Sequence, residues 1–192
     1  MARRLTPEVR RSEILRRTRE MIATQGAEGL SLRSVARWCG MSAPGLLHHF
    51  SSLQVLLEEV LAARDAEELA AFEAAMPADA TLRQWTDTVV RVSMTRAAEN
   101  RNFDALETRA LADPEHPAHD YFARRYGLRP FPATVALAER DYPRNPAAVV
   151  ELLGTVVDGL RLRWLRSDEV PDYAADWERI RDTLFAGFEQ YR

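Results

Sequence analysis

The feature that most restricts the fold of this 192-residue chain is its division by proline into long stretches of helical pattern. The prolines occupy positions 7, 44, 77, 114, 117, 130, 132, 143, 146 and 171. Between them, apolar residues recur at intervals of three and four, the period of one side of a helix. No stretch alternates long enough to form a strand, and no Asn-Gly or Asp-Gly turn joins alternating runs. The sequence therefore predicts an all-α fold.

The N-terminal helix has the clearest predicted boundaries. Thr6 is a capping residue, Pro7 suits a first helical turn, and Gly26 ends the apolar pattern. The stripe of this helix consists of Ile14, Leu15, Thr18, Met21 and Ile22. Further helices are expected over residues 53–75, 81–99, 102–112, 119–126, 132–141, 146–165 and 172–191.

Composition places the chain among globular proteins. With 46% hydrophobic and 29% charged residues it can bury a sizeable core, unlike a disordered tail. No apolar run approaches the roughly 18 residues of a membrane-spanning helix, and the N-terminus leads into polar sequence rather than a signal core. The single cysteine, Cys39, cannot form an internal disulfide. We therefore expect a cytoplasmic protein with no membrane partner.

Charge is distributed unevenly along the chain. The net charge is −3, yet residues 1–50 hold nine Arg and four Glu, a balance of +5, and residues 51–192 carry −8. Every basic side chain is Arg. This division predicts that only the N-terminal region approaches a polyanion, while the acidic remainder repels it.

The most informative segment is residues 31–50, SLRSVARWCGMSAPGLLHHF. Ser31 is placed to cap a short helix over residues 32–39, and Gly40 permits the tight turn after it. Ser42 then caps a second short helix with Pro44 in its first turn. Two short helices joined by a glycine-containing turn, after a longer basic helix, describe a helix-turn-helix unit.

The same pattern also fits a helical hairpin that only packs within an all-α protein. Two features favour DNA binding. A structural hairpin has no need of an Arg-rich preceding helix, nor of Ala43, Pro44 and Gly45 at the start of its second helix. Short side chains there allow the backbone to approach base-pair edges and phosphates.

Residues 1–57 resemble the N-terminal domain of TetR-family transcriptional regulators. The resemblance rests on the basic first helix, the run Ser-Leu-Arg-x-Val-Ala from Ser31, the Gly-x-Ser turn at Gly40 and the run His-Phe-x-Ser from His49. It implies a DNA-binding domain at 1–52 and a helical effector-binding and dimerisation domain at 53–192. The implied function is a repressor that binds palindromic double-stranded operator DNA as a homodimer and is released by a small-molecule effector.

The resemblance also implies the DNA-contacting residues. Ser31 and Arg33 would contact phosphates, and His49 and Ser52 would make further backbone contacts. The groove-facing part of the second short helix would be Ser42, Ala43, Pro44, Gly45, Leu47 and His48. His48 would be the main polar reader, whereas Leu47 offers only apolar contact, for example with a thymine methyl.

Two positions depart from the family pattern. The family often has Tyr where this chain has Leu47, and usually has Lys where it has Leu53. These changes remove a phenolic hydrogen bond and a phosphate-directed charge. Arg3 and Arg4 in an N-terminal arm could compensate for them.

The last two helices carry long apolar stripes, and the resemblance makes them the homodimer interface. The first stripe consists of Val149, Leu152, Leu153, Val156, Val157, Leu160 and Trp164. The second consists of Tyr173, Trp177, Ile180, Leu184, Phe188 and Tyr191. Each stripe also contributes to the core within one chain.

An effector pocket is expected among aromatic residues of the central helices, where the resemblance places it. Each of these residues taken singly fits an ordinary core position, and only the set suggests a pocket. The expected ligand-binding residues are Trp85, Phe103, Tyr121, Phe122 and Tyr126.

Other chemistry receives little support from the sequence. His116, His119 and Asp120 form an H-x-x-H-D run, but the prolines beside it interrupt a helix and no further ligands are evident, so we expect no metal site. No phosphate-binding loop, dinucleotide glycine motif or hydrolase motif occurs, which predicts no enzyme activity and no cofactor. A helical-bundle metal protein or enzyme, and an architectural DNA binder without an effector, are the alternatives. Trp38 has no predicted role.

Overall fold

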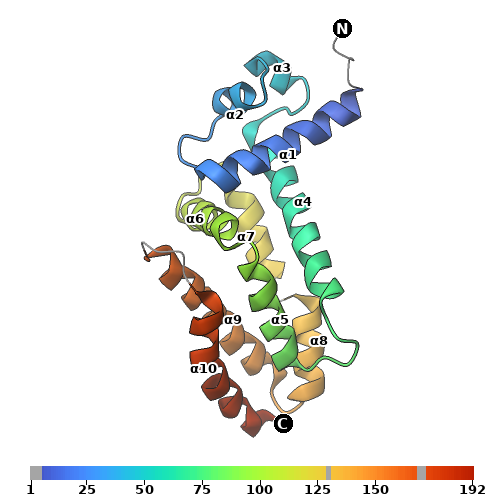
Figure 1. Ribbon diagram of the computed structural model, residues 1–192, viewed down its shortest axis with the longest axis vertical. Helices are drawn as coiled ribbons and strands as arrows, with labels where there is room; N and C mark the ends of the chain where they lie inside the picture. Colours follow the sequence, from blue (N-terminus) through green and yellow to red (C-terminus); the bar gives the residue numbers. More distant parts are fainter. Residues whose placement is uncertain (1–5, 129–130, 168–171) are drawn as a thin grey trace. The chain divides into compact units, whose positions relative to one another are not determined.

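The computed structural model describes residues 6–128, 131–167 and 172–192, and over these residues the chain is helical without a strand (Figure 1). The all-α prediction is confirmed. The helices are α1 (Pro7–Gln25), α2 (Leu32–Trp38), α3 (Ala43–Leu47), α4 (Leu53–Ala74), α5 (Leu82–Met94), α6 (Ala97–Ala112), α7 (His119–Leu128), α8 (Pro132–Asp141), α9 (Pro146–Leu165) and α10 (Tyr173–Phe188), followed by a short 3₁₀ turn, η1 (Glu189–Tyr191). None of the described helices is long and apolar enough to cross a membrane.

The chain divides into two compact units. The first unit consists of residues 1–67 and 102–123, and the second of residues 68–101 and 124–192. The first unit thus adds part of α4, α6 and α7 to residues 1–52. The functional boundary between residues 52 and 53 stays a prediction.

Local signals determine the bounds of α1. The Thr6 hydroxyl accepts a hydrogen bond from the Val9 N–H at 3.4 Å, and Pro7 occupies the first turn. The Gly26 N–H closes the last turn by donating to the Ile22 carbonyl at 2.9 Å. Four members of the predicted stripe are buried, and the fifth, Leu15, packs against the core.

The core of the first unit brings together side chains from α1, α2, α3, α4, α6 and α7. Its largest fully buried members are Ile14, Ile22, Val35, Leu46, Phe50, Leu56, Leu57, Leu61 and Leu106. Burying a side chain of this size contributes about 1.5–3 kcal/mol relative to leaving it in water. The short helices α2 and α3, which could not be stable alone, are held by this core.

In the second unit, α9 packs on α8 and α10, and α5 packs on α8 and α10. Its core is rich in aromatic rings. Phe72, Trp85 and Phe131 meet edge to face, with ring centroids 6.1–6.5 Å apart. Such pairs contribute about 0.5–1.5 kcal/mol beyond their burial.

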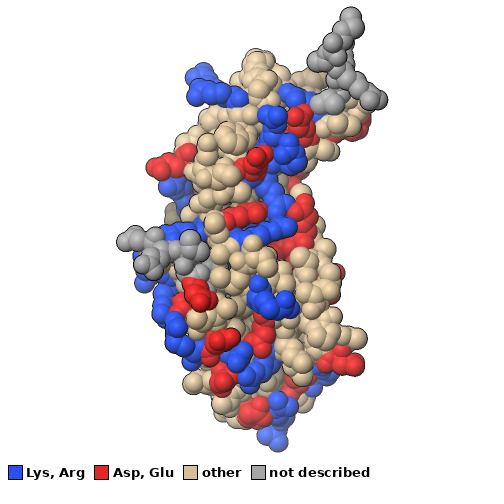
Figure 2. Space-filling view, viewed as in Figure 1, with Lys and Arg blue, Asp and Glu red and all other residues tan. Residues whose placement is uncertain are grey.

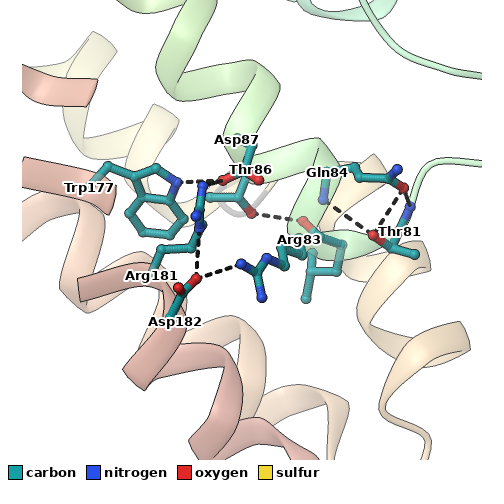
Figure 3. Close-up of polar contacts among 9 residues, drawn as sticks. Thr81, Arg83, Gln84, Thr86, Asp87, Trp177, Arg181 and Asp182 are labelled. Atoms are coloured by element: carbon teal, nitrogen blue, oxygen red, sulfur yellow. Dashed lines mark hydrogen bonds and ion pairs between the residues drawn. The ribbon is translucent and has the colours of Figure 1, made fainter. Parts of the chain in front are cut away.

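Polar contacts fix α10 against α5 (Figure 3). The indole N–H of buried Trp177 donates to Asp87 at 2.6 Å, and Arg181 lies 3.5 Å from the same carboxylate. Asp182 on α10 accepts from Arg83 on α5 at 2.5 Å and from Arg181 at 3.0 Å. These directional contacts give the pair of helices a definite register, which apolar packing alone specifies less strictly.

One predicted helix is wrong at its C-terminal end. The predicted helix over 81–99 ends at Met94, and α6 begins at Ala97 rather than at the predicted residue 102. The Thr95 hydroxyl donates to the Val92 carbonyl at 2.7 Å, and the Asn100 side chain donates to the Ser93 carbonyl at 2.8 Å. These side-chain bonds satisfy carbonyls that a continuous helix would use, so the helix ends without a glycine or proline.

Candidate nucleic-acid interface

The segment after α1 has the geometry of a helix-turn-helix. Ser31 and Ser34 form a reciprocal cap at the start of α2, since each side chain accepts from the other's backbone N–H, at 3.1 and 2.9 Å. Ser42 caps α3 by accepting from the Gly45 N–H at 3.1 Å. Capping satisfies donors that helices this short would otherwise expose, and a cap of this kind is worth about 1 kcal/mol.

Gly40 forms the turn between α2 and α3. Its φ is +65°, in the left-handed region that residues with a Cβ rarely adopt. An added Cβ would meet nothing within 4 Å, so the backbone conformation, not crowding, requires glycine here. The predicted turn is confirmed.

The short helix α3 has one inward and one outward side. Leu46 is fully buried, and Phe50 just beyond the helix is 1% exposed. Pro44, Leu47 and His48 are exposed, with Leu47 at 43%. Figure 2 shows mainly uncharged surface over α3 with Arg side chains beside it. This outward side is the surface that α3 could present to a DNA groove.

Three arginines of α1 bind the protein's own backbone. Arg10 donates to the Cys39 carbonyl at 3.3 Å, Arg11 to the His49 carbonyl at 3.5 Å, and Arg17 to the Trp38 carbonyl at 3.2 Å. These carbonyls lie at or just beyond the C-terminal ends of α2 and α3, where a positive charge is favourable. The α1 arginines therefore hold the helix-turn-helix together.

The same arginines and their neighbours on α1 also pair with carboxylates. Glu13 receives Arg10 at 2.7 Å and Arg17 at 3.3 Å, and the Arg10 hydrogen bond lowers the pKa of this carboxyl. Arg11 pairs with Glu59 at 2.5 Å and lies 4.1 Å from the ring centre of Phe50. The two remaining basic residues of α1, Arg16 and Arg19, pair with Glu20 and Glu67. All five arginines of α1 thus have a carboxylate partner, and Glu59 and Glu67 of α4 offset two of the +5 charges of residues 1–50.

Two arginines of α2 differ from those of α1. Arg33 and Arg37 are exposed, and within the described residues neither guanidinium group makes a hydrogen bond or an ion pair. Sequence reasoning selected Arg33 but missed Arg37, although its spacing of four from Arg33 places it on the same side of the helix. Arg3 and Arg4 lie outside the described residues.

The other predicted contact residues have structural roles as well. Ser52 caps α4 by accepting from the Val55 N–H at 3.1 Å, so Ser31, Ser42 and Ser52 are all helix caps. His49 is half-buried, and burial together with the charge of neighbouring His48 lowers the pKa of its imidazole. Ala43 and Gly45 are partly buried beside these caps. Trp38, which had no predicted role, packs against the core of the first unit.

The residues predicted to form an effector pocket fall into two separate cores. Trp85 belongs to the core of the second unit and donates through its indole N–H to Thr134 at 2.8 Å. Phe103 and Phe122 are buried in the first unit, where Tyr121 donates to Asp65 at 2.7 Å. Tyr126 lies in α7, but its side chain is outside the described part of the structure. Their role in binding a ligand stays a prediction.

The histidines near α7 bond to the backbone. His116 Nδ1 accepts from the Ala118 N–H at 3.1 Å, and His119 Nδ1 lies 2.8 Å from the Ala110 carbonyl. No group of three or more His, Cys, Asp or Glu side chains suited to a metal occurs in the described ranges. The thiol of Cys39 is buried, which raises its pKa and leaves it a small core side chain.

These observations define a class of protein, an all-α chain with an N-terminal helix-turn-helix. Comparison with known proteins agrees with that class. Residues 14–60 match the family model described as bacterial regulatory proteins, tetR family. No curated protein matches the sequence as a relative.

Solved structures extend the similarity over the whole chain. A putative TetR-family transcriptional regulator from Rhodococcus sp. is 22% identical and aligns over 95% of this chain and 98% of its own, with a TM-score of 0.65. Salmonella enterica GusR is 16% identical over 97% of each chain, with a TM-score of 0.66. A putative transcriptional regulator from Pseudomonas aeruginosa PAO1 is 18% identical over 98% of this chain and 97% of its own, with a TM-score of 0.65. The chain thus has the fold and the N-terminal domain of a TetR-family transcriptional regulator, as the sequence resemblance predicted.

Proposed function

We propose that this protein is a transcriptional repressor that binds operator DNA through α2 and α3 as a homodimer and is released by a small-molecule effector. The observation that carries the proposal is the contrast among its arginines. Those of α1 are engaged within the protein, whereas Arg33 and Arg37 on α2 remain exposed beside the outward side of α3. This is the arrangement expected when α1 positions the helix-turn-helix and α2 contacts phosphates.

Dimerisation follows from the geometry of DNA reading, because one recognition helix spans few base pairs. A twofold dimer reads two half-sites about 34–36 Å apart and so gains affinity. Support comes from the exposed side of α9, where Leu152 and Leu162 are each 45% exposed. Thr155 and Gly159 lie between them at helical spacing, and α10 exposes the small residues Thr183 and Ala186. Small and apolar residues on two adjacent helices suit a four-helix interface between two copies of the chain.

The fold is the only support for the small-molecule effector in this proposal. A ligand bound in residues 53–192 would favour a dimer in which the spacing of the two helix-turn-helix units no longer matches the operator. Such coupling amounts to about 1–3 kcal/mol in typical cases, equivalent to a 5–150-fold loss of DNA affinity.

The test compares the DNA binding of two Arg→Ala variants. Duplexes bound by the wild-type protein are first selected from a randomised pool, and affinity is then measured by fluorescence anisotropy across a range of salt concentrations. Arg33→Ala should weaken binding to all duplexes alike and reduce the salt slope by about one counterion per protomer. The matched control is Arg16→Ala, which removes an exposed arginine that pairs with Glu20 on α1.

Three outcomes would contradict parts of the proposal. An unchanged salt slope for Arg33→Ala would remove Arg33 from the phosphate contacts. Equal binding to every duplex, with bending of the DNA, would favour an architectural DNA binder. Failure to bind any duplex in dilute buffer, together with stoichiometric metal in the purified protein, would favour a helical-bundle metal protein.

A further inference from the structure

The outward side of α3 is unusually poor in hydrogen-bonding groups for a DNA-reading surface. The exposed side chains of α3 and its two caps are Ser42, Pro44, Leu47 and His48, and only the two caps have polar atoms. Leu46 is buried in the core, and Ala43 and Gly45 have no polar side chain. The Ser42 oxygen accepts the Gly45 N–H, which leaves one O–H as its donor toward a ligand.

This composition excludes the common bidentate contacts to bases. Guanine is usually read by Arg or Lys and adenine by Asn or Gln, and α3 has none of these. The apolar feature that a base pair presents in the major groove is the C5-methyl group of thymine. An apolar reading surface can therefore distinguish bases mainly by the presence and position of that methyl group.

We propose, on the basis of the function proposed above, that this protein recognises its operator through thymine methyl groups packed against Leu47 and Pro44. Leu47 is 43% exposed in the free chain, so it has apolar surface left to bury on a methyl group. His48 supplies a single hydrogen bond to a neighbouring base edge. The DNA class that fits is a half-site with thymine at the positions facing Leu47 and Pro44.

The test removes one methyl group at a time from the DNA. Operators are selected from randomised duplexes, and each thymine of the half-site is then replaced singly by deoxyuridine, which lacks only the C5-methyl. We expect one or two positions at which this replacement weakens binding about fourfold, the value of one buried methyl-sized group. Replacing such a T·A pair by 5-methylcytosine·guanine should retain more affinity than replacing it by cytosine·guanine.

Variants of the protein test whether Leu47 is the residue that senses the deoxyuridine replacement. Leu47→Ala should make binding insensitive to deoxyuridine at one position, while Val9→Ala, which truncates an exposed apolar side chain of α1, should leave the sensitivity unchanged. Leu47→Gln should shift the selected base at that position away from thymine, because an amide prefers adenine. Leu47 is exposed, so circular dichroism should show unchanged folding in both variants.

The outcomes separate this inference from the proposed function. Specific DNA binding in which no deoxyuridine replacement changes affinity by twofold would overturn the role of thymine methyls and leave the regulator intact. Retained sensitivity in Leu47→Ala would overturn the role of Leu47. Absence of binding to any duplex would overturn the proposed function itself, and this inference with it.

Discussion

A guanidinium group can bind a phosphate of DNA or a carbonyl of its own protein, and in this chain the two uses fall on different helices. Arg10, Arg11 and Arg17 each reach a backbone carbonyl of the helix-turn-helix, while Arg33 and Arg37 point to solvent. The charge balance along the sequence makes residues 1–50 the basic part of the chain. This balance could not separate structural from available charge, because that depends on which carbonyls lie within reach after folding.

His116 should make stability depend on pH. Burial lowers the pKa of its imidazole from 6.5, and Nδ1 accepts the Ala118 N–H in the neutral form. Below about pH 6.5 the unfolded chain therefore binds a proton more readily than the folded chain, so stability falls with pH until the folded imidazole also titrates. His116→Asn should keep an acceptor near Nδ1 and reduce the loss of unfolding free energy between pH 7 and pH 5, as measured by urea denaturation.

A second histidine, His49, should also contribute to the pH dependence of stability. His49 also has a lowered pKa, so His116→Asn should flatten the pH profile only in part. A profile identical to that of the wild-type protein would show that protonation of His116 is not coupled to folding.

At the scale of helices, boundaries set by local caps were predictable and the boundary set by a longer-range contact was not. Thr6 before Pro7 and Asn145 before Pro146 gave the starts of α1 and α9 correctly, because cap and proline act within a few residues. The end of α5 was missed. It depends on the Asn100 side chain reaching the Ser93 carbonyl seven residues earlier, and no glycine or proline marks that position.

The candidate site was predictable to a similar degree. The caps Ser31 and Ser42 and the turn at Gly40 are local features, and the structure has each of them. Arg37 could have been selected by its spacing of four from Arg33 on α2. The contact of Arg11 with the His49 carbonyl could not be read from the sequence, because it depends on how α1 lies against the segment after α3.

Two glycine substitutions should change stability in opposite directions. Gly40→Ala places a Cβ on a residue with φ of +65° and should lower the unfolding free energy by about 1–2 kcal/mol. Gly154→Ala lies within α9, where an added Cβ meets nothing within 4 Å, and should raise stability by about 0.5–1 kcal/mol. Chemical denaturation of both variants checks the pair, and equal effects would refute the conformational explanation.

At the scale of the whole molecule, the two proposed functions, DNA binding and dimerisation, lie in different units. The first unit contains the helix-turn-helix, and the second contains α9 and α10 with the exposed leucines. A carboxylate at the proposed interface should abolish association, since a charge buried between two copies would lack a partner. Leu152→Asp combined with Leu162→Asp should therefore convert the dimer to a monomer in sedimentation velocity, with unchanged helical circular dichroism.

The control for this prediction uses an exposed apolar residue elsewhere. Val9 is 51% exposed on α1, and Val9→Asp should leave the dimer intact. A wild-type protein that is monomeric at working concentrations would contradict the proposed assembly. A dimer that survives both leucine substitutions would place the interface on other helices.

The backbone contacts of the α1 arginines also limit how the helix-turn-helix could be re-engineered. Because Arg10, Arg11 and Arg17 close the ends of α2 and the segment after α3, residues 31–50 do not carry all the groups that hold their own shape. A graft of the two short helices onto another scaffold would need α1 or equivalent donors. New sequence preferences are better installed by changing single outward residues in place.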